Sequence, residues 1–249
     1  MPQLPNIKPQ WQVTSWSQLK RSPLNTGSGR SVVSLVEHPL GLLVERPYRH
    51  GGLRRLFFAD AFVKGPRAAN EFFIHHAAFV GGVATPEPIG WRERPLAIPF
   101  FCRYFFYSLY LDNAILLPNW LEKNGLSTNL AQQMAHIIYR LHELGIKHAD
   151  LNLNNWLVSG GKMYLIDFDK GTQTHQDPVV YLTAVLRRMV RSSRKLGVTP
   201  TLPFFRFVIK TAALFKLPPR DLIGLLPAAS HKRRFYHRFL WRLSGGHYR

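Results

Sequence analysis

The chain has 249 residues, of which 46% are hydrophobic and 19% charged, a globular composition that excludes a disordered or fibrous protein. Its 33 lysines and arginines outnumber 14 acidic residues and give a formal net charge of +19. Such a charge predicts an anionic partner: nucleic acid, an anionic membrane surface, or a phosphorylated or carboxylated substrate. A single cysteine, Cys102, excludes an internal disulfide and favours a reducing compartment.

The N-terminal ten residues are polar and lack the apolar core of a signal peptide. No uninterrupted apolar stretch reaches the roughly 18 residues that a spanning helix needs. We therefore expect a cytoplasmic protein whose membrane contact, if any, is peripheral.

Strand patterns dominate the first part of the chain. A small-residue loop, TGSGRS, stands at 26–31, and a basic glycine-containing loop, RPYRHGGLRR, at 46–55. The elements expected before residue 112 are strands at 32–37 and 40–46, a helix at 68–80 and an aromatic strand pair at 96–111.

Helical patterns dominate the second part, so the chain is predicted to form two lobes rather than one layered sheet. Apolar residues at helical spacing predict helices at 116–122 and 129–144. Ser127 or Asn129 is expected to cap the second helix, and Gly145 suits its C-terminal end. A short hairpin follows, and the last eighty or so residues are basic and helical in pattern.

The most informative segment is 146–171, with the sequence IKHADLNLNNWLVSGGKMYLIDFDKG. Its pattern of acids and amides favours phosphoryl transfer. The transferred group is strongly anionic and is held through magnesium, which prefers a few hard oxygen ligands. Asn155 and Asp167 would supply such oxygens, and Asp150 is placed to orient an attacking hydroxyl and accept its proton. His148 would fix the loop by a hydrogen bond. The plain alternative is a solvated loop and turn, which leaves the spacing beside an apolar strand unexplained.

This segment resembles the catalytic loop and metal-binding motif of the protein-kinase-like superfamily. The family pattern is His-x-Asp, an Asn five residues after that Asp, and Asp-Phe-Gly after an apolar strand. It is met here by His148, Asp150, Asn155, Asp167 and Phe168, with Asp169 in place of the glycine. The variant HADLNxxNxL with IDFDKG is similar to one subgroup, the bacterial 3-deoxy-D-manno-octulosonic acid (Kdo) kinases of lipopolysaccharide assembly.

Other parts of the resemblance lie upstream. They are a phosphate loop at Gly29 and Arg30, a basic motif VERPYRHGGL at 44–53, and a helix glutamate at Glu71. No strand lysine is visible to pair with that glutamate; Arg46 is the expected substitute, with Lys64 as the alternative, and the arginine fork suits phosphate. The alternatives are an ordinary turn for the glycine loop and a solvated surface position for Glu71.

The resemblance implies an α+β, two-lobed protein-kinase-like fold for a single domain spanning 1–249. An N-lobe of antiparallel strands with one helix would occupy 20–111 and a helical C-lobe 112–249, with ATP in the cleft. Asp150 would be the catalytic base, and Asn155 and Asp167 would hold Mg²⁺ with help from Asp169. Arg46, held by Glu71, would contact the phosphates.

The implied reaction transfers the γ-phosphoryl group of ATP to the 4-OH of Kdo on a lipid A precursor, at the cytoplasmic face of the bacterial inner membrane. That acceptor is anionic and lies in an anionic surface, where each basic residue contributes about 1 kcal/mol of attraction. Arg49, Arg54 and Arg55 are candidates for holding its carboxylates or phosphates. The run HKRRFYHRFLWR at 231–242 suits either an interfacial amphipathic helix or a helix packed on the C-lobe.

Other functions stay open at this point. The acceptor could be another lipopolysaccharide sugar, such as heptose, or another small molecule. A pseudokinase would bind nucleotide without transfer, and a nucleic-acid-binding protein would also explain the charge, although the kinase motif makes nucleic acid an unexpected partner. The histidine spacing does not favour zinc, and no Gly-x-Ser-x-Gly elbow supports hydrolase chemistry.

Overall fold

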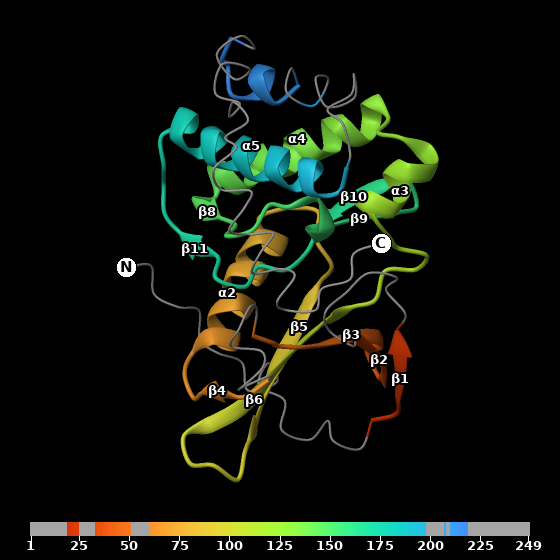
Figure 1. Cartoon of the computed structure of the whole chain (residues 1–249), viewed down its shortest axis with the longest axis vertical. Coiled ribbons are helices and arrows are strands. Elements are labelled where there is room, and N and C mark those ends of the chain that lie inside the picture. The colour runs from red at the N-terminus through yellow and green to blue at the C-terminus, as the bar shows by residue number, and fades with distance from the viewer. Residues whose placement is uncertain (1–18, 25–32, 51–59, 198–206, 208–209, 219–249) are drawn as a thin grey trace. The chain divides into compact units, whose positions relative to one another are not determined.

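The computed structural model of the chain describes residues 19–24, 33–50, 60–197, 207 and 210–218. These residues group into two compact units. The first holds the described residues up to Pro66 together with Gly90–Tyr107, and the second holds Arg67–Ile89 and the described residues from Ser108 onward. The described part is α+β, as the sequence predicts (Figure 1), and the lobe boundary at 111/112 stays a prediction.

Some of the sequence predictions fall on residues that the structure does not describe. These are Gly29 and Arg30 of the expected phosphate loop, Arg54 and Arg55, and the C-terminal run at 231–242. Their proposed roles stay predictions.

The first unit is built on a six-stranded sheet with the order β1-β2-β3-β6-β4, in which β5 also pairs with β6 (Figure 1). The pairs β1–β2, β2–β3 and β4–β6 are antiparallel. The strands are β1 (Arg21–Leu24), β2 (Val33–His38), β3 (Gly41–Pro47), β4 (Phe62–Val63), β5 (Pro88–Pro95) and β6 (Phe101–Leu109). The first two residues of β5 and the last two of β6 belong to the second unit. The β2–β3 hairpin lies within one residue of its predicted position.

An aromatic cluster forms part of the core of this unit. The rings of Tyr48, Phe62 and Tyr104 lie with their centroids 5.9–6.4 Å apart, and all three are almost fully buried. The backbone N–H of Tyr48 donates to the carbonyl of Tyr104 at 3.0 Å. Because these rings remove a large apolar area from water, they stabilise the sheet on which Arg46 is carried.

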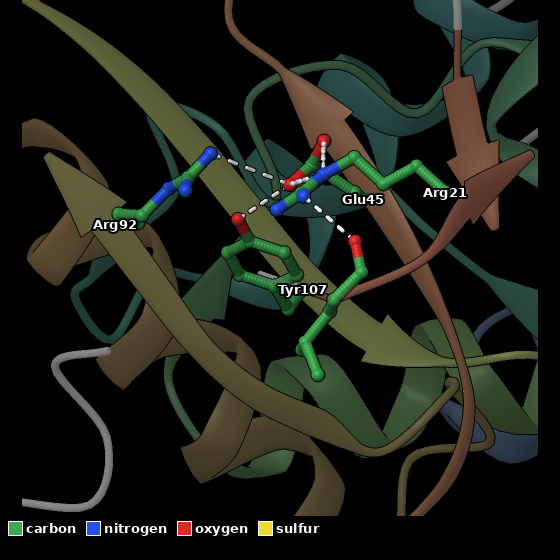
Figure 2. A network of polar contacts seen from close by, with 5 residues as sticks. Arg21, Glu45, Arg92 and Tyr107 are labelled. Carbon is green, nitrogen blue, oxygen red and sulfur yellow. Dashed lines mark hydrogen bonds and ion pairs between the residues drawn. The ribbon is translucent and has the colours of Figure 1, made fainter. Parts of the chain in front are cut away.

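A buried carboxylate joins four strands of the sheet. Glu45 on β3 is 6% exposed and accepts from Arg21 Nε at 3.1 Å and from the Tyr107 hydroxyl at 2.6 Å (Figure 2). The guanidinium of Arg92 lies 3.5 Å from the same carboxylate. Burial, followed by the bond to Glu45, raises the pKa of the Tyr107 phenol, so it remains a donor.

We expect Glu45→Gln to lower the free energy of unfolding by roughly 3 kcal/mol, because a neutral amide leaves two partly buried guanidinium groups without their counter-charge. Denaturant unfolding would measure this loss. Glu37→Gln on the neighbouring strand is the matched control, since Glu37 pairs with Lys20 in solvent, and its loss should stay under about 1 kcal/mol. Equal losses in the two variants would contradict a structural role for the Glu45 network.

The second unit combines helices with two small sheets, β10-β9-β7 and β11-β8 (Figure 1). Its helices are α2 (Arg67–Val80), α3 (Leu117–Asn124), α4 (Thr128–Glu143) and α5 (Pro178–Lys195), with a 3₁₀ turn at Leu153–Asn155. Its strands are β7 (Ile115–Leu116), β8 (Ile146–Lys147), β9 (Trp156–Ser159), β10 (Lys162–Leu165) and β11 (Thr172–Gln173). Within the described part of the chain, no helix is long and apolar enough to cross a membrane.

Helix α4 lies at the centre of the core of this unit. Seven of its side chains are buried, at the helical spacing predicted from the sequence. Ser127 caps its start by accepting from Leu130 N at 3.2 Å. The helix ends at Glu143, and Gly145 follows with a φ of 65°, a conformation that glycine adopts without steric cost. The end of α4 and the turn at Gly145 therefore position the start of the 146–171 segment beside the core.

Candidate active site

His148 links the two halves of the predicted catalytic segment. Its Nδ1 accepts from the backbone N–H of Asp150 at 3.1 Å, and its Nε2 lies 3.2 Å from the carbonyl of Ile166. A carbonyl can only accept, so Nε2 is the protonated nitrogen and the imidazole is neutral. Burial lowers the pKa of His148, which favours the same neutral form. The loop-fixing hydrogen bond expected from the sequence is therefore made.

Asn155 and Asp167 are brought together by the backbone. The N–H of Ile166 donates to the carbonyl of Asn155 at 2.9 Å, which places Asp167 one residue beyond this bond. The side-chain Nδ2 of Asn155 donates to the carbonyl of Asp150 at 2.7 Å. Hydrogen bonds thus join His148, Asp150 and Asn155 to one another and to Ile166, the residue before Asp167, all within the second unit.

The donor set fits magnesium. Because Nδ2 of Asn155 is held by the Asp150 carbonyl, the amide oxygen lies on its other side, where it can act as a ligand. A carboxylate from Asp167 adds a second hard oxygen donor, and magnesium typically takes one or two such groups and keeps several waters. In the described residues, no three histidine, cysteine, aspartate or glutamate side chains gather as they would around a fully protein-bound metal.

Asp167 adopts a left-handed backbone conformation, with a φ of 67°. Aspartate tolerates this region better than most side chains, but it still costs energy relative to an extended conformation. The conformation is maintained by the packing of the next residue, Phe168, which is fully buried. The strain is therefore held at the residue that is predicted to bind the metal.

Two histidines hold Phe168. Its ring stacks on His75 of α2 at 4.6 Å between centroids and meets the edge of His148 at 4.9 Å. Nε2 of His75 lies 2.6 Å from the hydroxyl of Thr85, which donates to the carbonyl of Leu165 at 2.6 Å. Helix α2, the end of β10 and the catalytic loop are joined through these buried contacts, so a shift of α2 would be transmitted to Asp167.

Asp169 has a partner that the sequence reasoning did not anticipate. Arg67, the first residue of α2, donates from Nε to its Oδ1 at 2.9 Å and from Nη2 to its other oxygen. A two-pronged pair of this kind is the strongest geometry for a carboxylate and a guanidinium. Arg67 takes up one lone-pair site on each oxygen of Asp169, and the expected auxiliary role of Asp169 at the metal stays a prediction.

Asp150 also pairs with an arginine. Nη1 of Arg188, on α5, lies 2.9 Å from its Oδ1, and the two side chains are 44% and 46% exposed. An ion pair this exposed contributes about 0.2–1 kcal/mol, so a competing ligand can displace it. The predicted base is solvent-accessible and one of its oxygens is held by a cation.

The expected phosphate-binding residues lie in different units. Arg46 lies over the rings of Tyr48 and Phe106, 5.0 and 5.6 Å from their centroids. Glu71 is 2% exposed, which excludes the alternative of a solvated surface glutamate. Because Arg46 belongs to the first unit and Glu71 to the second, their pairing stays a prediction.

Three residues of these networks were missed by the sequence reasoning: Arg67, Arg188 and Glu45. Arg67 and Arg188 are two of 33 lysines and arginines, and they lie 102 and 38 residues from their partners. No local pattern distinguishes them from the other cations. For Glu45 a signal was present, because successive side chains of a strand point to opposite faces of the sheet. This places Glu45 on the same buried face of β3 as Leu43.

We expect the stability of the chain to fall as the pH drops below about 6.5, partly through His148. The folded state holds this imidazole neutral while the unfolded chain protonates it, so the free energy of unfolding decreases by about 1.4 kcal/mol per pH unit until the lowered folded pKa is reached. Denaturant unfolding from pH 8 to pH 5 would measure the slope.

The matched pair for this measurement is His148→Gln and His136→Gln. His136 is exposed on α4 and serves as the control, whereas His148→Gln should flatten the slope below pH 6.5. An unchanged slope in His148→Gln would show that the folded state does not depend on the neutral imidazole.

Comparison with known proteins supplies the family. A model described as the lipopolysaccharide kinase (Kdo/WaaP) family matches residues 14–202, which is most of the chain. The chain belongs to this family. As a member of the Kdo/WaaP kinase family, it is a phosphotransferase.

Relatives with curated names agree with this assignment. The chain is 29% identical over 176 residues to a 3-deoxy-D-manno-octulosonic acid kinase of Vibrio parahaemolyticus, covering 68% of this chain and 72% of that one. It is also 29% identical over 174 residues to the kinase of the same name from Vibrio vulnificus, covering 68% and 71%. A third such kinase, from Mannheimia succiniciproducens, is 32% identical over 133 residues, covering 50% and 55%.

A solved structure supports the fold. The structure of WaaP in complex with acyl carrier protein matches 90% of this chain and 89% of that chain, with a TM-score of 0.52 and 17% identity. At this identity the likeness speaks for the fold alone. Together with the antiparallel sheet and the helices, it establishes the protein-kinase-like fold that the sequence predicts.

Proposed function

We propose that this Kdo/WaaP family kinase transfers the γ-phosphoryl group of ATP to the 4-hydroxyl of Kdo on a lipid A precursor. The observation on which this rests most is that hydrogen bonds tie Asp150 to Asn155 and Asn155 to Ile166, which places Asp167 beside them just after an apolar strand. The names of the curated relatives support the choice of acceptor.

In the proposed reaction, the acceptor oxygen bonds to the γ-phosphorus while the bond from that phosphorus to the bridging oxygen of ADP breaks. Asp150 accepts the hydroxyl proton, through the oxygen that Arg188 does not hold. His148 keeps the backbone of Asp150 in place and is not itself a proton carrier, because both of its nitrogens are engaged with the backbone.

Asn155 and Asp167 would hold Mg²⁺ through their side-chain oxygens. When bound, the metal neutralises the developing charge on the phosphates. The left-handed backbone of Asp167 and the hydrogen bond from Asn155 Nδ2 orient these two side chains before a metal arrives. Orientation in advance lowers the cost of assembling the site.

We further propose that the protein works at the cytoplasmic face of the inner membrane, as a peripheral protein. The acceptor named in this proposal is anchored in a membrane and is itself anionic. The net charge of +19 supports the idea, since an anionic surface attracts basic residues at about 1 kcal/mol each. Sedimentation with vesicles of anionic or neutral lipid would test it, and equal binding to both would count against it.

The function is tested by transfer of labelled γ-phosphate from Mg²⁺-ATP to three acceptors: a lipid A precursor with Kdo, the same precursor without Kdo, and a heptose-bearing core. Transfer is expected to the first alone, at the 4-hydroxyl, as established by NMR of the product. Transfer to the heptose acceptor alone would keep the kinase and replace the acceptor. Nucleotide binding without transfer to any of the three would favour a pseudokinase.

A further inference from the structure

Arg188 lies beside the predicted base, and its helix is attached to the catalytic loop through a second residue. One turn further along α5, the buried hydroxyl of Ser192 accepts from the backbone N–H of Leu153 at 2.9 Å, which ties the helix to the catalytic loop. Residues 188 and 192 lie on the same side of a helix. The docking of α5 therefore fixes the backbone of residue 188 within side-chain reach of Asp150, whether or not the ion pair is formed.

The ion pair with Asp150 does not by itself account for an arginine at this place. Both side chains are almost half exposed, so the contact adds little to the stability of the fold. The backbone of Asp150 is already fixed by His148 and Asn155. A cation that is carried on a docked helix, weakly paired and open to solvent beside the base is available to bind an incoming anion.

We infer that Arg188 binds the carboxylate of the acceptor sugar and so determines that the substrate is a sugar acid. The inference rests on the proposed function, in which the acceptor is an octulosonic acid and has a carboxylate on the same sugar as the reacting hydroxyl. A guanidinium has five N–H donors in a planar fork and matches a carboxylate in a two-pronged pair. It can therefore hold the acceptor while Asp150 receives the hydroxyl.

The transferred phosphoryl group is the other anion that Arg188 could bind, because its oxygens accept hydrogen bonds as a carboxylate does. The acceptor carboxylate is favoured because Arg188 contacts the base, and the base contacts the acceptor hydroxyl rather than the nucleotide. The predicted metal ligands Asn155 and Asp167 are the groups that face the phosphates in this scheme. The two sources are separated by whether the KM for the acceptor or the KM for ATP changes.

The test compares Arg188→Ala, Arg188→Lys and the control Arg187→Ala on two acceptors, the Kdo-bearing precursor and its counterpart with the Kdo carboxylate converted to a carboxamide. Arg187 is the exposed neighbour on the same helix, so its removal changes the net charge equally. Arg188→Ala should raise the KM for the carboxylate acceptor about 10- to 100-fold, as expected for a charge-assisted hydrogen bond, and leave the KM for ATP within about twofold. Arg188→Lys should recover part of the loss, and Arg187→Ala should behave as wild type.

The carboxamide acceptor supplies the decisive comparison. Wild type should lose a similar factor on it, and Arg188→Ala should lose nothing further, because the partner is already gone. An equal loss from Arg188→Ala on both acceptors, a change in the KM for ATP instead, or an equal loss in Arg187→Ala would each overturn the assignment. Failure of wild type to phosphorylate the Kdo acceptor would sink the proposed function and this inference together, whereas wild-type transfer with unaffected Arg188→Ala would sink this inference alone.

Discussion

Asp150→Asn is expected to lower the rate constant for phosphoryl transfer by about 10²- to 10⁴-fold, the usual contribution of a general base. The amide keeps the shape of the side chain, and its oxygen can still accept from Arg188, but it cannot take up the hydroxyl proton. The loss should appear in kcat with little change in the KM for ATP, because the proton moves only as the reaction proceeds. Initial rates with labelled ATP and the Kdo-bearing acceptor would measure it.

Asp112→Asn is the matched control for this substitution. Asp112 is an exposed aspartate of the same unit, and the bond it makes to Ser159 uses its backbone carbonyl, so the amide should leave both activity and stability unchanged. Near-equal thermal unfolding midpoints for the two variants and wild type would exclude a folding defect. Full transfer by Asp150→Asn would remove Asp150 from the mechanism as the base.

Local sequence signals predicted the elements around the site well, because the interactions that form them are local. The capping hydroxyl of Ser127 bonds a backbone group three residues away, and Gly145 lies at the left-handed position that ends α4. The hairpin after the catalytic loop turns at Gly160 and Gly161, both with positive φ. Each of these features depends on the side chain or the backbone preference of one or two residues, which can be read from the sequence.

The grouping of His148, Asp150, Asn155 and Asp167 was predictable for a related reason. The hydrogen bonds that join the first three to one another and to Ile166, the neighbour of Asp167, span 2, 5 and 18 residues, so the whole arrangement is contained in one loop and one hairpin. A motif with fixed spacing can encode such a site.

The long-range ion pairs could not be predicted, because they depend on how distant elements pack. Asp169 resembled a further metal ligand in the sequence, yet Arg67 holds both of its oxygens from 102 residues away. Arg188 reaches Asp150 from α5, a helix that packs on the core and bonds to the catalytic loop through Ser192. In a chain with a net charge of +19, the pattern of charges gives no means of choosing which cation meets which carboxylate.

Asp167→Asn is expected to remove most Mg²⁺-dependent transfer, by roughly 10²- to 10³-fold, because a metal ligand contributes several kcal/mol to the stabilisation of transition-state charge. Asparagine tolerates the left-handed backbone of this position as well as aspartate does. The substitution therefore changes the charge and leaves the fold. The measurement is the Mg²⁺ dependence of the initial rate, together with the rise in unfolding temperature that Mg²⁺-ATP produces in each protein.

Asp167→Gly separates the carboxylate from the backbone conformation that presents it. Glycine adopts a φ of 67° without steric cost, so it retains the conformation and removes the ligand. If the carboxylate binds the metal, the asparagine and glycine variants should lose transfer to a similar extent, and Mg²⁺ should no longer add to the thermal shift caused by ATP alone. If the left-handed conformation is what matters, both variants should keep the Mg²⁺-dependent shift and most of the activity, and Asp167 would then be a positioning residue for Phe168 rather than a metal ligand.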